Sequence, residues 1–248
     1  MTSAGDAAAR RADLSTGLSH VEDRIRAACM ASGRARADVR LIVVTKFFPS
    51  ADVELLAQLG VTDIGENRDQ EASAKIAALP AEVRRLLQVH FIGQLQSNKA
   101  GSVAAYADTV HSIDRDRLVI ALDRAATSRG RDIGALIQVN LGASAGGGPG
   151  AGAARGGIQP DGVAALADSI AGSRHLLLRG VMGVAPLGVD PGEAFGQLAR
   201  CAQDLQANHP GATWISAGMS GDLESAVANG ATHLRVGSAI LGSRPLLG

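Results

Sequence analysis

Eight short apolar runs, separated by longer amphipathic stretches, constrain the fold of this chain more than any other feature. Each run has the length and content typical of a buried strand. The stretches between them repeat apolar residues at three- and four-residue spacings, which predicts helices. The runs lie at residues 41–46, 61–67, 88–95, 109–113, 135–141, 176–184 and 213–219 and from residue 233 onward. Strands that alternate with helices form a parallel sheet, and eight such strands are the number that closes a barrel.

The length of the chain agrees with a closed barrel. A (β/α)8 barrel typically has roughly 250 residues, and this chain has 248. We therefore predict an α/β protein with a single-domain (β/α)8 TIM barrel at residues 13–248; a doubly wound open sheet is the alternative. Residues 1–12 are small and polar and are predicted to form a flexible tail. An amphipathic helix after the tail should cover the barrel beside the last strand, because few residues follow that strand.

Charge, apolar content and cysteines exclude several classes of function. The 24 basic and 24 acidic side chains leave no net charge, so we expect no nucleic acid and no acidic membrane as a partner. No apolar run reaches the ~18 residues of a membrane span, and the first residues lack the apolar segment of a signal peptide. Cys29 and Cys201 stand far apart without a Cys/His cluster, which predicts neither a metal site nor a disulfide and favours a cytoplasmic location.

The first predicted strand ends on a single lysine, Lys46, which two phenylalanines and a proline follow. Lysine is rarely buried without a partner, so a lysine at the end of a core strand either reaches solvent or takes part in chemistry. The most common such chemistry is the formation of a Schiff base by its amine. On this stretch alone, a side chain that extends to solvent is the simpler interpretation.

Small and polar residues follow several other strands, where barrels place their functional groups. Asn67 ends the second strand, and residues 216–222 combine glycine and serine just before a predicted helix, as phosphate-binding loops do. The eighth strand places Arg235 and Gly237 on one face, with Ser238 at the rim. Each residue also has an ordinary interpretation, as a turn glycine, a helix cap or an ion-pair partner.

Together these residues suit pyridoxal phosphate (PLP), which needs a lysine for its aldehyde and a site for its phosphate. We therefore predict that Lys46 holds this cofactor as a Schiff base. Arg235 would face the pyridine nitrogen. Because an arginine cannot accept a proton, it would keep that nitrogen neutral and make the ring a weaker electron sink than an aspartate would.

The chain resembles the pyridoxal phosphate homeostasis protein family, single-barrel relatives of the alanine racemase fold (PLP fold type III). The matching segments are VTKFFP around Lys46, GENRDQE at 65–71, HFIGQLQSNK at 90–99, RGVMGVAP at 179–186 and the stretch 216–242. The resemblance implies that Lys46 is the cofactor lysine, that Asn67 lies beside the ring and that Arg235 faces its nitrogen. It also implies that the phosphate is held by Ser216, Gly218, Met219, Gly237 and Ser238, and that His90 and Ile92 line the pocket.

His90 and residues 94–99 keep more than one interpretation, and one loop departs from the family pattern. His90 is equally well explained as a core histidine with satisfied hydrogen bonds. Residues 94–99 form either a solvated helix cap or a surface contact that the family retains. The Gly/Ala-rich loop at 142–157 stands where the family commonly has a serine-lysine loop. Arg155 at its end is expected to replace the charge of that lysine.

The resemblance implies a PLP-binding protein that maintains the intracellular balance of PLP (vitamin B6) and amino acids without substantial catalysis. Its expected partners are PLP and either apo-PLP enzymes or amino acids, and a monomer is expected. Racemisation needs a second base, and the single tyrosine, Tyr106, is predicted far from the strand ends. An amino-acid racemase that uses His90 or His111 is one alternative. The others are a cofactor-free aldolase-type barrel and an interaction module.

Overall fold

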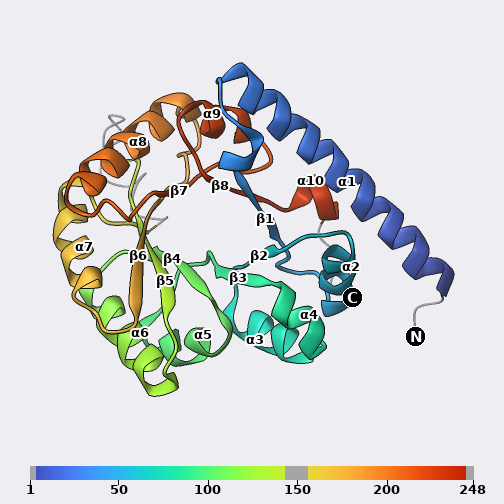
Figure 1. Cartoon of the computed structure of the whole chain (residues 1–248), viewed down its shortest axis with the longest axis horizontal. Helices are drawn as coiled ribbons and strands as arrows, with labels where there is room; N and C mark the ends of the chain where they lie inside the picture. Colours follow the sequence, from blue (N-terminus) through green and yellow to red (C-terminus); the bar gives the residue numbers. More distant parts are fainter. Residues whose placement is uncertain (1–3, 143–155, 244–248) are drawn as a thin grey trace.

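The computed structural model describes residues 4–142 and 156–243, in which eight parallel strands form one closed barrel (Figure 1). The strands are β1 (Arg40–Val44), β2 (Asp63–Glu66), β3 (Gln88–Phe91), β4 (Thr109–Ile113), β5 (Ile133–Gln138), β6 (Leu176–Met182), β7 (Trp214–Ser216) and β8 (His233–Val236). β8 pairs with β1, with Arg235 opposite Ile42, and this pairing closes the barrel. The predicted (β/α)8 fold is confirmed, and the closed strand order excludes the open sheet.

Helices surround this barrel (Figure 1). They are α2 (Ser50–Gln58), α3 (Asp69–Ala78), α4 (Ala81–Leu86), α5 (Ala100–Tyr106), α6 (Asp116–Arg129), α7 (Val163–Ala171), α8 (Pro191–Asn208), α9 (Leu223–Ala228) and α10 (Ser238–Leu241), with 3-10 turns η1 (Arg36–Asp38), η2 (Ser97–Lys99) and η3 (Pro160–Gly162). Local sequence sets their ends. Asp190 caps α8 by accepting a hydrogen bond from the backbone of Gly192, and Gly130 ends α6 with a φ of 59°.

The N-terminal segment differs from the prediction. Helix α1 (Ala4–Ala31) begins within the residues predicted as a flexible tail. This segment is rich in alanine, the strongest helix former, and Arg10 attaches it to the barrel. The Arg10 Nη2 atom lies 2.7 Å from Asp52 Oδ2 and 3.2 Å from the Leu241 carbonyl oxygen. As predicted, the helix covers the barrel beside its last strand, where it lies along α9 and α10 (Figure 1).

Buried apolar side chains form one cluster that includes inward-facing residues of the surrounding helices. The barrel interior differs, because several of its buried residues are polar: His90, His111, Ser216, His233 and Arg235. No helix in the described residues has the length and apolar character needed to cross a membrane. Most of the Gly/Ala-rich loop predicted at 142–157, namely residues 143–155 with Arg155, lies outside the described residues.

Candidate functional site

A pocket of about 430 Å³ lies at the ends of the strands where functional groups were predicted. Most of the predicted binding residues line it: Lys46, Asn67, Ile92, Met219, Arg235, Gly237 and Ser238. The prediction missed the apolar lining of Val44, Phe47, Phe48, Met182 and Val184, and also Ser220, Gly221 and Gly242. The two phenylalanines directly follow Lys46 in the sequence, which was the available signal. Three predicted residues, His90, Ser216 and Gly218, are not among the lining residues.

Lys46 is presented by a turn with an unusual backbone. The next residue, Phe47, has a φ of 72°, a left-handed conformation that few residues other than glycine adopt. Glu71 on α3 accepts a hydrogen bond from the Phe47 backbone N–H and thereby holds this conformation. Such strained residues persist only where their surroundings fix them. The turn around Lys46 is therefore held from outside by α3.

A buried lysine on α3, Lys75, completes this support. Its Nζ atom lies 2.7 Å from the Thr45 carbonyl oxygen, 2.8 Å from Glu66 Oε1 and 3.1 Å from Glu71 Oε1. Three acceptors satisfy the three donors of the ammonium group. Burial raises the pKa of Glu66, and the Lys75 charge offsets only part of this effect. This ionic cluster of Glu66, Glu71 and Lys75 was not recognised in the sequence.

The predicted phosphate loop lies at the pocket rim. Gly218 has a φ of 88°, and a Cβ atom there would lie 2.6 Å from the Ala226 Cβ atom, so this turn needs glycine. The turn brings the Ser220 hydroxyl within 3.3 Å of the Ser238 hydroxyl at the start of α10. The Met219 N–H donates to Asp222 Oδ1 at 2.6 Å, so this backbone donor already has a partner within the loop.

Arg235 lies in the pocket wall with 4% of its surface exposed. Its Nη1 donates to the Ser216 hydroxyl at 2.7 Å and its Nη2 to the Gly183 carbonyl oxygen at 2.9 Å. The hydrogen bonds described for its side chain thus go to neutral acceptors, unlike those of an ion-pair partner. Burial lowers the pKa of Arg235 to about 10, which leaves it charged at neutral pH. A buried cation of this kind favours an anionic or electron-rich ligand in the pocket.

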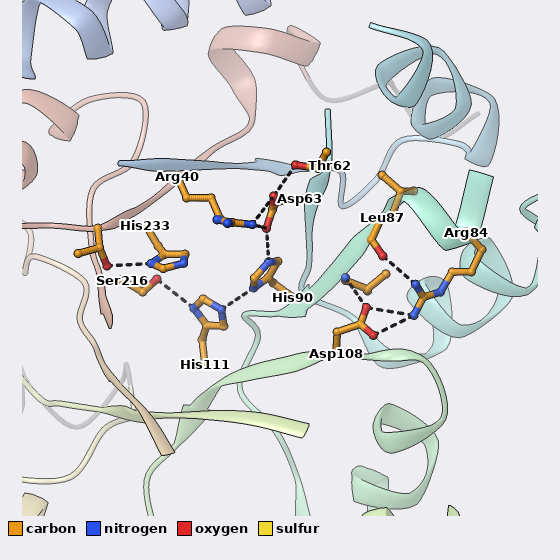
Figure 2. A network of polar contacts seen from close by, with 12 residues as sticks. Arg40, Thr62, Asp63, Arg84, Leu87, His90, Asp108, His111, Ser216 and His233 are labelled. Atoms are coloured by element: carbon orange, nitrogen blue, oxygen red, sulfur yellow. Dashed lines mark hydrogen bonds and ion pairs between the residues drawn. The ribbon is translucent and has the colours of Figure 1, made fainter. Parts of the chain in front are cut away.

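His90 and Ser216 lie in the barrel interior (Figure 2). His90 Nε2 is 3.0 Å from Asp63 Oδ1, and His90 Nδ1 is 2.9 Å from His111 Nε2. His90 is thus the core histidine with satisfied hydrogen bonds that the sequence allowed as its alternative. Side chains that lie two residues apart on a strand share a face. Ile92 therefore lines the pocket while His90 occupies a deeper layer.

Residues 94–99 border a second cavity, of about 520 Å³, whose lining includes Gln94, Gln96, Lys99 and Asn67. Asn67 also lines the first pocket. The Lys99 side chain is half exposed, with Nζ 3.7 Å from Asp69 Oδ2. Both interpretations of this segment are compatible with its place at a cavity edge.

His233 gives the barrel interior a pH-dependent stability. Burial lowers its pKa to about 3, and its Nε2 has no hydrogen-bond partner among the described residues. In the unfolded chain the pKa of this histidine is ~6.5, so between these two pKa values the unfolded state binds one more proton than the folded state. Stability should therefore fall by ~1.4 kcal/mol per pH unit as the pH drops through this range. A His233→Phe variant is expected to lose this part of the slope between about pH 6 and pH 4.

Urea unfolding at half-unit pH steps measures this slope. The control is His20→Gln, which changes an exposed histidine on α1 and should leave the slope unaltered. An equal slope in wild type and His233→Phe would contradict the assignment of a neutral His233.

The closed barrel, with a lysine after β1 and an arginine on β8, can now be compared with known families of barrels. The family model described as "Alanine racemase, N-terminal domain" matches residues 18–245. The structure of alanine racemase from Corynebacterium glutamicum has the same fold, with a TM-score of 0.64 at 13% identity. The alignment covers 92% of this chain and 62% of that one. The chain is therefore a barrel of the alanine racemase N-terminal domain class.

More similar relatives narrow the assignment. The chain is 41% identical to the pyridoxal phosphate homeostasis protein of Mycobacterium tuberculosis (strain ATCC 25618 / H37Rv), over 96% of this chain and 95% of that protein. It is 32% identical to PipY of Synechococcus elongatus PCC7942 in a structure with PLP bound, with a TM-score of 0.76 and coverage of 92% and 100%. The chain belongs to the pyridoxal phosphate homeostasis protein family.

Proposed function

We propose that this chain binds PLP as a Schiff base on Lys46 and takes part in the intracellular homeostasis of PLP and amino acids. The observation that carries the proposal is that Lys46 and the buried Arg235 line one pocket of about 430 Å³. The PLP-bound PipY structure, at 32% identity, supports it. The partners we propose are PLP and, in addition, either apo-PLP enzymes or amino acids.

The residues present suit this cofactor in size and chemistry. The pocket volume is in the range of small-molecule sites, and apolar walls flank its few polar groups. When bound, the cofactor supplies an aldehyde that condenses with a lysine amine. Lys46 provides that amine, Ser220 and Ser238 offer hydroxyls for a phosphate, and Arg235 holds a positive charge that cannot accept a proton. Asn67 would orient the ring.

The described lining of the pocket favours binding over turnover. Its ionisable side chains are Lys46 and Arg235, and a racemase needs a second base at the reacting carbon. His90 and His111, the candidates for that base, lie in the barrel interior. The Tyr106 hydroxyl lies 3.4 Å from Asp69 Oδ1, and burial together with Asp69 raises its pKa. We therefore infer a carrier or regulatory protein with little or no catalysis.

The absorption spectrum of the purified protein with added PLP tests this proposal. We expect a band at ~420 nm that borohydride fixes covalently, as a protonated Schiff base would give. Lys46→Ala should lack the band, whereas Lys99→Ala, which removes a half-exposed lysine, should retain it. A colourless wild type would reject PLP binding. Rapid loss of optical activity from single amino acids would instead favour the racemase.

A further inference from the structure

A continuous series of hydrogen bonds crosses the barrel interior behind the pocket (Figure 2). It begins at Asp63 on β2, passes through His90 on β3 and His111 on β4, and reaches Ser216 on β7. His111 Nδ1 lies 2.9 Å from the Ser216 hydroxyl, and that hydroxyl accepts from Arg235 Nη1 at 2.7 Å. We call Asp63, His90, His111 and Ser216 the interior network. Its last member holds the arginine of the pocket wall.

The charge of Asp63 gives the interior network a direction. Burial raises the pKa of Asp63, but hydrogen bonds from His90 and Thr62 outweigh this effect and leave it below the usual value. A carboxylate only accepts hydrogen bonds, so His90 must donate from Nε2. In the tautomer with its single proton on Nε2, His90 accepts at Nδ1, and His111 then donates to it from Nε2.

The same logic extends to the pocket. Burial, followed by the charges of its neighbours, lowers the pKa of His111 well below its usual value. Because a neutral His111 that carries its proton on Nε2 has an acceptor at Nδ1, the Ser216 hydroxyl must donate to it. The lone pairs of the Ser216 oxygen then remain for Arg235. Each hydrogen bond in the interior network thus points from Ser216 towards Asp63.

We propose that the interior network positions Arg235 for the pocket ligand, with Asp63, His90, His111 and Ser216 acting as positioning residues. The inference rests on the proposed function, because it assigns these residues to the support of a PLP site. Arg235 is held at both Nη atoms, by Ser216 and by the Gly183 carbonyl. The placement of Arg235 in the pocket wall therefore depends on Asp63, although three side chains lie between the two residues.

An Asp63→Asn variant tests the direction of the hydrogen bonds in the interior network with little change in side-chain shape. Thr62 donates to Oδ2 of Asp63 at 2.7 Å, and Arg40 Nη1 donates to both carboxylate oxygens, at 3.2 Å to Oδ1 and 3.3 Å to Oδ2. The short hydrogen bond from Thr62 should therefore place the amide oxygen at the Oδ2 position. The amide NH2 would then face His90 and require an acceptor at His90 Nε2. Both histidines should shift their proton to Nδ1. Ser216 would then accept from His111 as well as from Arg235, which weakens its hold on the arginine.

Histidine tautomers in the cofactor-free protein give the first readout. Nitrogen-15 NMR of histidine-labelled protein should show the Nε2–H form for His90 and His111 in wild type and the Nδ1–H form in Asp63→Asn. Asp132→Asn is the matched control, because Asp132 accepts from His175 at 2.8 Å on the surface. It should leave His90 and His111 unchanged. Nδ1–H tautomers in the wild type would overturn the proposal.

Titration with PLP, followed by absorbance, gives the second readout. We expect about 3- to 10-fold weaker binding and a shifted band in Asp63→Asn, in line with the weakening of one hydrogen bond to a charged group. Ser216→Ala should show the same loss and Ser216→Thr should restore it, since threonine keeps the hydroxyl. Unchanged affinity and spectrum in Asp63→Asn and Ser216→Ala would overturn the proposal. If neither the wild type nor any variant binds PLP, the result rejects the proposed function rather than the role of the interior network.

Discussion

Replacing Lys75 by methionine is expected to lower the free energy of unfolding by about 3–5 kcal/mol, because it leaves a buried charge without its partner. Lys75 is 7% exposed and Glu66 is fully buried. The Oε2 atom of Glu66 already lacks a hydrogen-bond partner among the described residues. Without the ammonium, Glu66 must either take up a proton or remain charged in the core.

The Lys75→Met substitution should also weaken PLP binding in the pocket. Lys75 donates to the Thr45 carbonyl and to Glu71, which holds the left-handed Phe47. Thr45 and Phe47 are the two neighbours of Lys46 in the chain. Lys75→Met should therefore loosen the turn that presents Lys46. We expect slower and weaker reaction of the variant with PLP under conditions where it is still folded.

Urea unfolding of Lys75→Met, with Lys99→Met as control, measures the effect. The ion pair of the half-exposed Lys99 with Asp69 spans 3.7 Å, and such surface pairs contribute roughly 0–1 kcal/mol. Adding Glu66→Gln to Lys75→Met should recover part of the loss by removing the stranded charge. If the two lysine variants are equally stable, the buried cluster contributes nothing beyond a surface pair.

The barrel and the location of the pocket were predictable because both follow from local pattern. Apolar periodicity identifies strands and helices, and parallel strands bring their carboxyl ends to one edge. Lys46, Asn67 and Arg235 were predicted in this way as binding residues, and the structure places them around one pocket. The predicted tail at 1–12 was wrong from Ala4 onward, because composition alone did not show that Arg10 attaches this segment to Asp52.

The contact between Glu66 and Lys75 and the interior network were not predictable, because their members come from different elements. Glu66 lies on a strand and Lys75 on a helix, and only folding brings them to 2.8 Å. His90 and His111 are each the single histidine of their strand. From sequence alone, such a histidine could equally belong to an interior hydrogen-bond network or to a pocket wall. Ser216 ends the three-residue strand β7, and its side chain faces the barrel interior rather than the pocket rim. The alternation of side chains along the strand could not predict this, because the sequence does not show the exact residue at which the strand ends.

Replacing Gly93 by alanine is expected to cost about 3 kcal/mol or more, above the usual range for overpacking, because rigid backbone blocks the added methyl group. A Cβ atom at Gly93 would lie 2.0 Å from the Asn67 carbonyl oxygen and 2.8 Å from Asn67 Oδ1. Gly93 follows β3 and Asn67 follows β2, so the methyl group must push these two loops apart. Asn67 lines the pocket, and PLP binding should weaken together with stability.

Gly101→Ala is the matched control, since a Cβ atom on this α5 residue would have no neighbour within 4 Å. Alanine in a helix is favoured over glycine by roughly 0.5–1 kcal/mol, so this variant should gain stability and bind PLP normally. Thermal unfolding and PLP titration of both variants separate two claims. A Gly93→Ala protein as stable as wild type would contradict the close approach of the two loops. A destabilised but folded protein with unchanged PLP affinity would place Asn67 away from the ligand, because the displaced loop would then carry no contact that binding requires.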